Sequence, residues 1–234
     1  MASGWAVQAI LVSDDPHGHA AHQRLDRSPK SGQIPTFSLP PRAFATLTDT
    51  VHAPGIAACL GWTAPTFNAQ SGDHASLKRV LICDRIADPG NVGTLIRTAA
   101  ALGLDAVILC AGTVELANPK TLRSAAGAFF HIPVFEEIKP AVVGAWCTKN
   151  GVKLLVADAH RGEALSVVGV AERWALVVGA ETIPLDPYWE SVPVSWIRLP
   201  LQRHVESLNA AVAGAIIMDR LCRGGEAVAA RSRR

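Results

Sequence analysis

The stretch "RVLICDRIADPGNVGTLIRTAAALGLDAVILC", residues 79–110, carries the pattern that decides the fold. Two nearly continuous apolar runs of strand length, 79–84 and 106–110, flank the segment 91–103. In that segment apolar residues recur at helical spacing, and Gly103 is suited to end a helix. A strand, a helix and a second strand at this spacing predict a parallel β-α-β unit.

Three further runs, 153–158, 174–179 and 194–199, have the same apolar texture, which is typical of strands covered on both faces. We therefore predict an α/β domain over residues 77–225, with a parallel sheet and helices on both faces. Residues 1–66 differ in texture, with one apolar run at 5–12 followed by a polar stretch. Residues 67–76 show no periodicity and predict a linker, and residues 226–234 predict a solvated basic tail.

Composition narrows the class of protein. Apolar residues make up 49% of the chain and charged residues 18%, which indicates a globular protein. The net charge of +2 is too small to demonstrate a nucleic-acid partner and does not oppose one. The five cysteines are scattered and form no C-x-x-C pair, which favours a reducing compartment over a disulfide framework or a structural zinc. Without a signal peptide or an apolar stretch of membrane-spanning length, we expect a soluble, cytoplasmic protein.

The turn and helix after the first apolar run form the first candidate site. Asn91 stands where a helix N-cap is expected, and Gly93 permits close packing, so a well-made loop and helix would account for both. That interpretation leaves Arg97 unexplained, on the flank of an apolar helix near the carboxyl edge of the sheet, where ligands of open α/β sheets bind. Both the Walker A loop and the G-x-G-x-x-G fingerprint are absent.

Two more segments carry candidate residues. In "LVVGAETIPLDP", 176–187, Gly179 ends an apolar run and would let a ligand approach the backbone, whereas Glu181 alone would fit a solvated loop equally well. Ser207 and Asn209 open an unusually apolar segment, where they could cap a helix or face a ligand. Ser207 is a poor hydrolase nucleophile because the sequence has no G-x-S-x-G elbow.

Taken together, these segments resemble a known family. "DPGNVGTLIRTAAALG", "LVVGAE" and "IRLPLQRHVESLNAAVAGAI" are similar, in order and spacing, to the three motifs of the SpoU-type RNA 2′-O-ribose methyltransferases of the SPOUT superfamily. Residues 118–134 resemble the family's connecting segment, so the resemblance covers roughly residues 78–222. "FATLTDTVHAPGIAACL" also resembles the end of the small N-terminal RNA-binding domain of many members, whose front is shortened here. The resemblance therefore implies a small, shortened α/β domain over residues 1–66.

The resemblance implies a C-terminal trefoil knot, S-adenosylmethionine as cofactor, no metal and no membrane. It also implies an RNA substrate, with rRNA favoured over tRNA, and a homodimer that completes each active site. Five residues are implied in catalysis: Arg97, Asn91, Glu181, Ser207 and Asn209. Cofactor contacts are implied mainly from the backbone around Gly179, Leu199 and Leu208.

A guanidinium is a poor base, so we expect Arg97 to anchor a phosphate and polarise the 2′-hydroxyl. Thr182, Pro184 and Arg203 stand where the family usually has glycine, and they place cofactor affinity in question. The alternative to an enzyme is therefore a non-catalytic RNA-binding homologue of the same fold. His17, His19 and His22 match no family pattern, and we expect them in a solvated loop without a metal.

Overall fold

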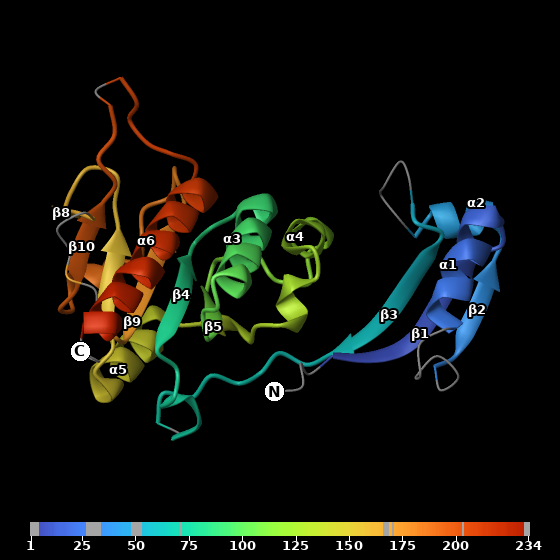
Figure 1. The fold of residues 1–234 in the computed structure, drawn as a ribbon, viewed down its shortest axis with the longest axis horizontal. Helices are drawn as coiled ribbons and strands as arrows, with labels where there is room; N and C mark the ends of the chain where they lie inside the picture. Colours follow the sequence, from blue (N-terminus) through green and yellow to red (C-terminus); the bar gives the residue numbers. More distant parts are fainter. Residues whose placement is uncertain are drawn as a thin grey trace. The chain divides into compact units, whose positions relative to one another are not determined.

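The computed structural model describes residues 5–26, 34–47, 53–70, 72–165, 169, 171–202 and 204–231. The chain divides into two compact units, Met1–Thr63 and Ala64–Arg234 (Figure 1). Within the described part, no helix has both the length and the apolar character needed to cross a membrane.

The first unit is a three-stranded mixed sheet with two helices. Its central strand pairs in parallel with one neighbour and antiparallel with the other. The elements are β1 (Trp5–Ser13), α1 (Pro16–Asp26), β2 (Thr36–Leu39), α2 (Pro41–Ala45) and β3 (Ile56–Trp62). This is the small α/β architecture that the family resemblance implies.

His17, His19 and His22 lie on α1 rather than in the predicted loop. Asp15 accepts a hydrogen bond from the backbone N–H of Gly18 (2.9 Å), and Pro16 occupies the first helical position. A carboxylate acceptor before a proline is a strong helix start, and it outweighs the polar character of the segment. His17 and His19 are nevertheless exposed.

The second unit is built on a seven-stranded sheet in which every pairing is parallel. Its spatial order is β6-β5-β4-β9-β7-β10-β8. The bounds are β4 (Arg79–Asp84), β5 (Ala106–Cys110), β6 (Val134–Ile138), β7 (Lys153–Ala157), β8 (Glu163–Ala164), β9 (Trp174–Gly179) and β10 (Ser195–Arg198). The five predicted strands are confirmed, and β9 inserts between β4 and β7 although β7 precedes it in the chain.

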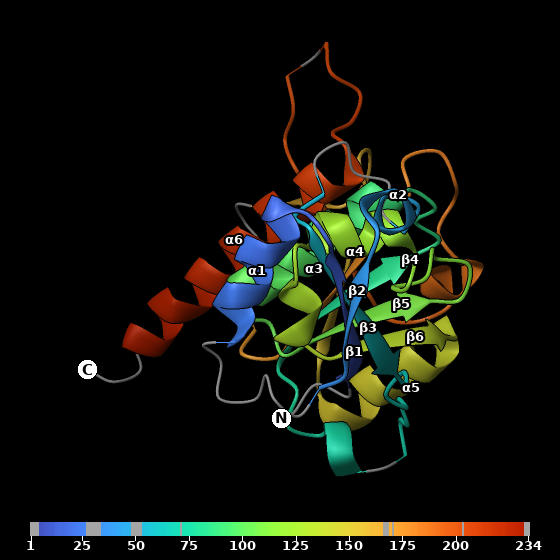
Figure 2. The same ribbon diagram turned by 90° about the vertical axis from the view of Figure 1, so that its right-hand side faces the viewer.

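Helices cover both faces of this sheet, as predicted. The bounds are α3 (Pro89–Ala101), α4 (Pro119–Ala125), α5 (Pro140–Asn150) and α6 (Ala210–Arg231). Helices α3 and α6 contact each other, and α6 contacts β9, whereas α5 contributes Val143, Trp146 and Cys147 to the core on the opposite face. Figure 2 shows α3, α4 and α6 on one side of the strands and α5 on the other.

Helix α3 begins two residues before the predicted start. Its cap is Asp88, whose Oδ1 accepts a hydrogen bond from the backbone N–H of Asn91 (2.8 Å), so Asn91 is not the N-cap. Asp is as good a cap as Asn, and Pro89 is suited to the first helical position. The Asn91 side chain is thereby left free for another role. Gly103, with φ of 70°, ends the helix as predicted.

The predicted linker packs on the second unit. Phe67 and Ala69 are buried in its core, and the indole Nε1 of Trp146 donates a hydrogen bond to the carbonyl of His74 (3.3 Å). The His74 ring stacks on Phe67 with centroids 4.8 Å apart. These contacts hold the aperiodic segment against the second unit.

All five cysteines are free, in agreement with the prediction that they form no disulfide. Four of them are buried, and Cys59 is exposed. Burial raises the pKa of the Cys147 thiol to about 12, so this side chain acts as a small apolar group.

Candidate active site

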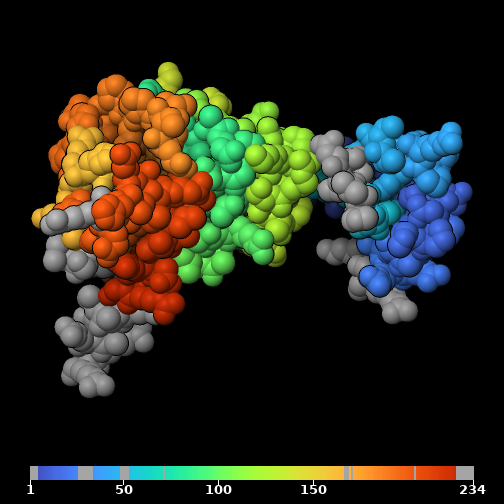
Figure 3. All heavy atoms as spheres, turned by 90° about the horizontal axis from the view of Figure 1, so that it is seen from above, coloured from blue at the N-terminus to red at the C-terminus, as the bar shows by residue number. Residues whose placement is uncertain are grey.

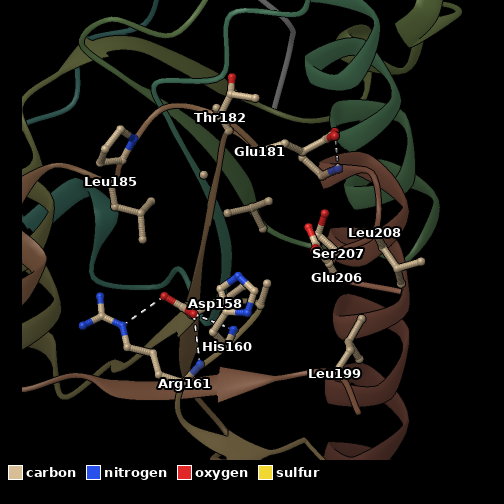
Figure 4. Close-up of a pocket in the computed structure, with 18 of the residues that line it drawn as sticks. Asp158, His160, Arg161, Glu181, Thr182, Leu185, Leu199, Glu206, Ser207 and Leu208 are labelled. Atoms are coloured by element: carbon tan, nitrogen blue, oxygen red, sulfur yellow. Dashed lines mark hydrogen bonds and ion pairs between the residues drawn. The ribbon is translucent and has the colours of Figure 1, made fainter. Parts of the chain in front are cut away.

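A cavity of about 570 Å³ opens at the carboxyl edge of the sheet in the second unit (Figure 4). Residues 157–161 after β7 and 178–185 around the end of β9 form two of its walls. The third wall comes from the loop after β10 and from the first turns of α6, including Ala213. This is the edge at which a ligand is expected in an open α/β sheet.

Three of the predicted catalytic residues meet beside this cavity. The Asn209 side-chain amide donates hydrogen bonds to Asn91 Oδ1 (2.9 Å) and to Glu181 Oε1 (3.1 Å). Glu181 Oε1 also accepts from the backbone N–H of Ala210 (3.0 Å). The structure therefore joins the three sequence motifs through one amide group. Glu181 is exposed, but these two hydrogen bonds hold its carboxylate in place. Among the described residues, Glu181 Oε2 has no hydrogen-bond partner.

Asn209, and not Ser207, caps α6. Asn209 Oδ1 accepts from the backbone N–H groups of Ala211 (3.0 Å) and Val212 (3.3 Å), and the helix begins at Ala210. The alternative that Ser207 is a helix cap is thus wrong, because the chain turns into the helix two residues later. Ser207 instead lines the cavity, as do Leu199 and Leu208.

Gly179 also lines the cavity, but the space of its missing side chain is taken by protein. A Cβ there would lie 2.4 Å from Cδ2 of Leu185. The glycine thus allows the loop after β9 to fold back over the end of its own strand. The approach of a ligand to the Gly179 backbone stays a prediction, and on one side the Leu185 side chain occupies the space.

A buried carboxylate fixes that loop. Asp84, fully buried at the end of β4, accepts hydrogen bonds at Oδ2 from the backbone N–H of Asp186 (2.7 Å) and from Trp189 Nε1 (2.9 Å). Burial raises the pKa of Asp84, against the opposing effect of these two bonds. Thr182 and Pro184 belong to the loop so fixed and line the cavity, whereas Arg203 lies outside the described residues.

The sequence analysis missed a cluster of charges in the wall after β7. Arg161 Nε donates to Asp158 Oδ2 (3.0 Å), Arg161 Nη2 donates to Glu190 Oε1 (2.5 Å), and the guanidinium lies 3.4 Å from the ring centroid of Trp196. Burial works against the charge of Asp158, but the bonds from His160 N, Arg161 N and the guanidinium hold its pKa below the ordinary value. Polar residues directly after a predicted buried strand were the signal that could have found this cluster.

Arg97 does not reach the cavity of its own chain. Arg97 lies one turn after Gly93 on α3, on the flank of the helix that packs against α4. Asn91 lies on a different flank of α3, one turn before Leu95, and Leu95 contacts α6. The Arg97 side chain is exposed and makes no hydrogen bond or ion pair with any residue that the structure describes. Across the described ranges, no group of three or more His, Cys, Asp or Glu residues could hold a metal ion.

The model of the SpoU rRNA methylase family matches residues 78–219, more than half of the chain. The chain belongs to this family. The 23S rRNA (guanosine(2553)-2′-O)-methyltransferase RlmP of Bacillus subtilis is 36% identical over 215 residues, covering 92% of this chain and 80% of RlmP. The present protein, as a member of the SpoU family, is an S-adenosylmethionine-dependent RNA 2′-O-methyltransferase.

Solved structures match the fold over both units. The SpoU methyltransferase AviRb of Streptomyces viridochromogenes is 23% identical with a TM-score of 0.79, covering 96% of this chain and 84% of AviRb. An AdoMet-bound rRNA methyltransferase of Sinorhizobium meliloti is 20% identical with a TM-score of 0.76, covering 94% of this chain and 81% of that chain. The SpoU fold predicted from the three motifs is therefore confirmed.

Proposed function

We propose that this SpoU family member methylates a ribose 2′-hydroxyl in ribosomal RNA, and that its substrate is the RNA of the large subunit. The observation that carries the proposal is the hydrogen-bonded set of Asn91, Glu181 and Asn209 beside the cavity. The substrate class is supported by the family description and by the 23S rRNA activity named for the Bacillus subtilis relative.

The experiment is to map 2′-O-methylation in the RNA of cells that carry or lack the gene. We expect one ribosomal nucleotide to lose its methyl group and purified protein to restore it in vitro. Loss of a methyl group from tRNA alone would overturn the proposed substrate. Unchanged rRNA and tRNA, together with RNA binding by the purified protein, would favour the non-catalytic homologue.

The cavity fits S-adenosylmethionine in its chemistry. Leu199, Leu208 and Leu185 give it apolar walls suited to an adenine, and the backbone at Gly179 offers hydrogen-bonding groups. When bound, the cofactor supplies an electrophilic methyl group on a cationic sulfur. The pocket's carboxylates favour a cation over a neutral or anionic ligand. Calorimetry with S-adenosylmethionine tests whether Thr182 and Pro184 weaken this binding.

In the proposed reaction the protein's contribution is positioning and polarisation. Arg97 anchors a phosphate of the RNA and polarises the 2′-hydroxyl, and Ser207 completes the hydrogen-bonding shell of the nucleotide. Asn209 holds Asn91 and Glu181 in fixed places, so that the second oxygen of Glu181 can accept a hydrogen bond from the substrate. A reacting pair held in line gains much of the advantage of an intramolecular reaction.

We further propose a homodimer, and completion of each active site within it. Val212 on α6 is 48% exposed, and Ile216, one turn later, is only partly buried. Figure 3 shows much of the described part of α6, in red, on the surface of the second unit. Because Arg97 lies outside the cavity of its own chain, a second copy is the source of the missing part of the site. A cytoplasmic location is also proposed, with support from the five free cysteines.

A further inference from the structure

Six ionisable side chains line the cavity, and four of them are already engaged by the protein. Arg161 binds both Asp158 and Glu190, and Glu181 holds the start of α6. The remaining two, His160 and Glu206, have no side-chain partner among the described residues. They are therefore available to a ligand.

These two groups stand on neighbouring loops. His160 follows β7 and Glu206 follows β10, and the two strands are adjacent and parallel, with Val156 beside Trp196. Both loops thus leave the same edge of the sheet side by side. Figure 4 shows the His160 ring and the Glu206 side chain directed toward the same hollow.

The surroundings of His160 restrict how it can move. The loop that carries His160 is held by Asp158 Oδ1, which accepts from the backbone N–H groups of His160 (2.8 Å) and Arg161 (3.0 Å). Gly162, with φ of 93°, lies so close to β10 that a Cβ would be 2.3 Å from the carbonyl oxygen of Trp196. His160 is therefore presented from a backbone that has little freedom.

We propose that His160 and Glu206 bind the α-amino-acid end of the cofactor, His160 its carboxylate and Glu206 its ammonium group. An imidazole N–H donates to a carboxylate, and a carboxylate accepts from an ammonium, so one donor and one acceptor match a zwitterion. An RNA phosphate fits this corner less well than a zwitterion does, because it has no positive group for Glu206, whose charge no described side chain offsets. The assignment rests on the proposed function, in that the cavity must be the cofactor site.

The test compares ligands with and without the amino-acid end, by calorimetry on the full chain. S-adenosylhomocysteine carries the zwitterion, and 5′-methylthioadenosine shares the nucleoside and the sulfur but lacks it. We expect His160→Ala and Glu206→Gln each to weaken S-adenosylhomocysteine binding about tenfold or more, which is the usual loss for one charge-assisted hydrogen bond. Binding of 5′-methylthioadenosine should stay within about twofold, which also shows that the pocket is folded.

Decarboxylated S-adenosylmethionine separates the two roles, since it retains the ammonium and lacks the carboxylate. His160→Ala should bind it as tightly as the unmodified chain does, whereas Glu206→Gln should bind it more weakly. His204→Ala and Glu163→Gln are matched controls, because both residues are exposed and neither lines the cavity. These two variants should bind every ligand normally.

Equal losses for 5′-methylthioadenosine and S-adenosylhomocysteine would overturn the assignment and show a merely structural role. Unchanged binding of S-adenosylhomocysteine by both variants would also overturn it, while leaving the proposed function intact. An unmodified chain that bound neither S-adenosylmethionine nor S-adenosylhomocysteine would overturn the proposed function together with this inference.

Discussion

Asn209 does two things with one side chain. Its oxygen satisfies two backbone N–H groups at the start of α6, and its nitrogen ties Asn91 to Glu181. Only an amide offers both an acceptor and two donors in this arrangement. The residue that starts the helix thus also fixes the spacing of the proposed catalytic groups.

Replacing Asn209 should therefore affect stability and activity together. We expect Asn209→Ala to lower the free energy of unfolding by about 1–2 kcal/mol, the usual loss for a helix cap, and to reduce methyl transfer. Ser207→Ala should reduce methyl transfer with a change in unfolding free energy under about 0.5 kcal/mol, since Ser207 caps nothing. Urea unfolding and single-turnover kinetics on the same preparations check both. Equal destabilisation by the two variants would contradict the assignment of the cap.

At Arg97 an effect on turnover can be separated from effects on stability and cofactor affinity, because the residue is exposed and has no partner among the described residues. Arg97→Ala should leave cofactor affinity and melting temperature nearly unchanged and lower turnover at least about a hundredfold, which corresponds to about 3 kcal/mol of transition-state stabilisation. Arg97→Lys should restore only part of the rate, because an ammonium lacks the planar fork of a guanidinium. Thr94→Ala, exposed on the same helix, is the control. Near-normal turnover in a stable, cofactor-binding Arg97→Ala would refute the role.

Asp84 gives the stability of the protein a pH dependence of known sign. Its pKa is raised in the folded chain, so the folded state binds this proton more tightly than the unfolded state does. Asp84 therefore contributes least to the free energy of unfolding at pH values above its folded pKa. Its contribution to that free energy increases as the pH falls from the folded pKa toward the ordinary aspartate range. We expect Asp84→Asn to lack this contribution, so the difference in unfolding free energy between the two proteins should vary with pH in this direction. Urea titrations from pH 4 to 8 measure it, and a constant difference would count against the raised pKa.

At the scale of the elements, close contacts between helices depend on single glycines. A Cβ on Gly93 of α3 would lie 2.5 Å from the carbonyl oxygen of Thr121 and 2.8 Å from the backbone nitrogen of Ala125, both in α4. Gly214 of α6 similarly leaves room for Leu95 of α3. Backbone atoms cannot yield as a flexible side chain can, so Gly93 is the stricter of the two requirements.

Gly93→Ala should accordingly destabilise the chain although alanine is the better helix former. Forcing α3 from α4 costs about 1–3 kcal/mol, more than the gain of about 1 kcal/mol in helix propensity. Gly72→Ala is the control, because no heavy atom lies within 4 Å of its added Cβ. Thermal unfolding compares them, and a Gly93→Ala variant as stable as the parent would show that α4 shifts freely.

The elements also show what sequence could and could not predict. The five long apolar runs, 79–84, 106–110, 153–158, 174–179 and 194–199, identified five strands because burial on both faces leaves a continuous apolar signature. Strands β6 and β8 were not predicted, because they lie at the edges of the sheet and carry acidic residues that interrupt the apolar pattern. One of these residues, Glu136 of β6, accepts a hydrogen bond from the backbone N–H of Leu116.

The candidate site was likewise predicted in part. Motif spacing identified Asn91, Glu181 and Asn209, which the structure joins. The charged wall with Arg161 and the capping role of Asp88 depend on contacts between loops, which no local pattern encodes. No local sequence pattern encodes the position of Arg97 outside the cavity of its own chain either.

At the scale of the whole molecule, we expect the protein to sediment and scatter light as a dimer at micromolar concentration. Val212→Glu should shift it toward the monomer by burying a charge in the interface. Glutamate in the first turn favours the start of α6, so the variant should not unfold the helix itself. Val7→Glu, also at an exposed valine but in the first unit, should remain dimeric. A monomer mass for the unmodified chain would exclude the dimer.

Strand β9 is synthesised long after β4, its neighbour in the sheet, and this order has a consequence for the nascent chain. Arg79 pairs with Trp174, so β4 has an open side until about a further 95 residues have left the ribosome. Until then the nascent chain exposes an apolar strand edge that invites pairing with other chains. Such distant parallel pairing is slow to form, so newly synthesised copies should depend on chaperones more than their modest size suggests.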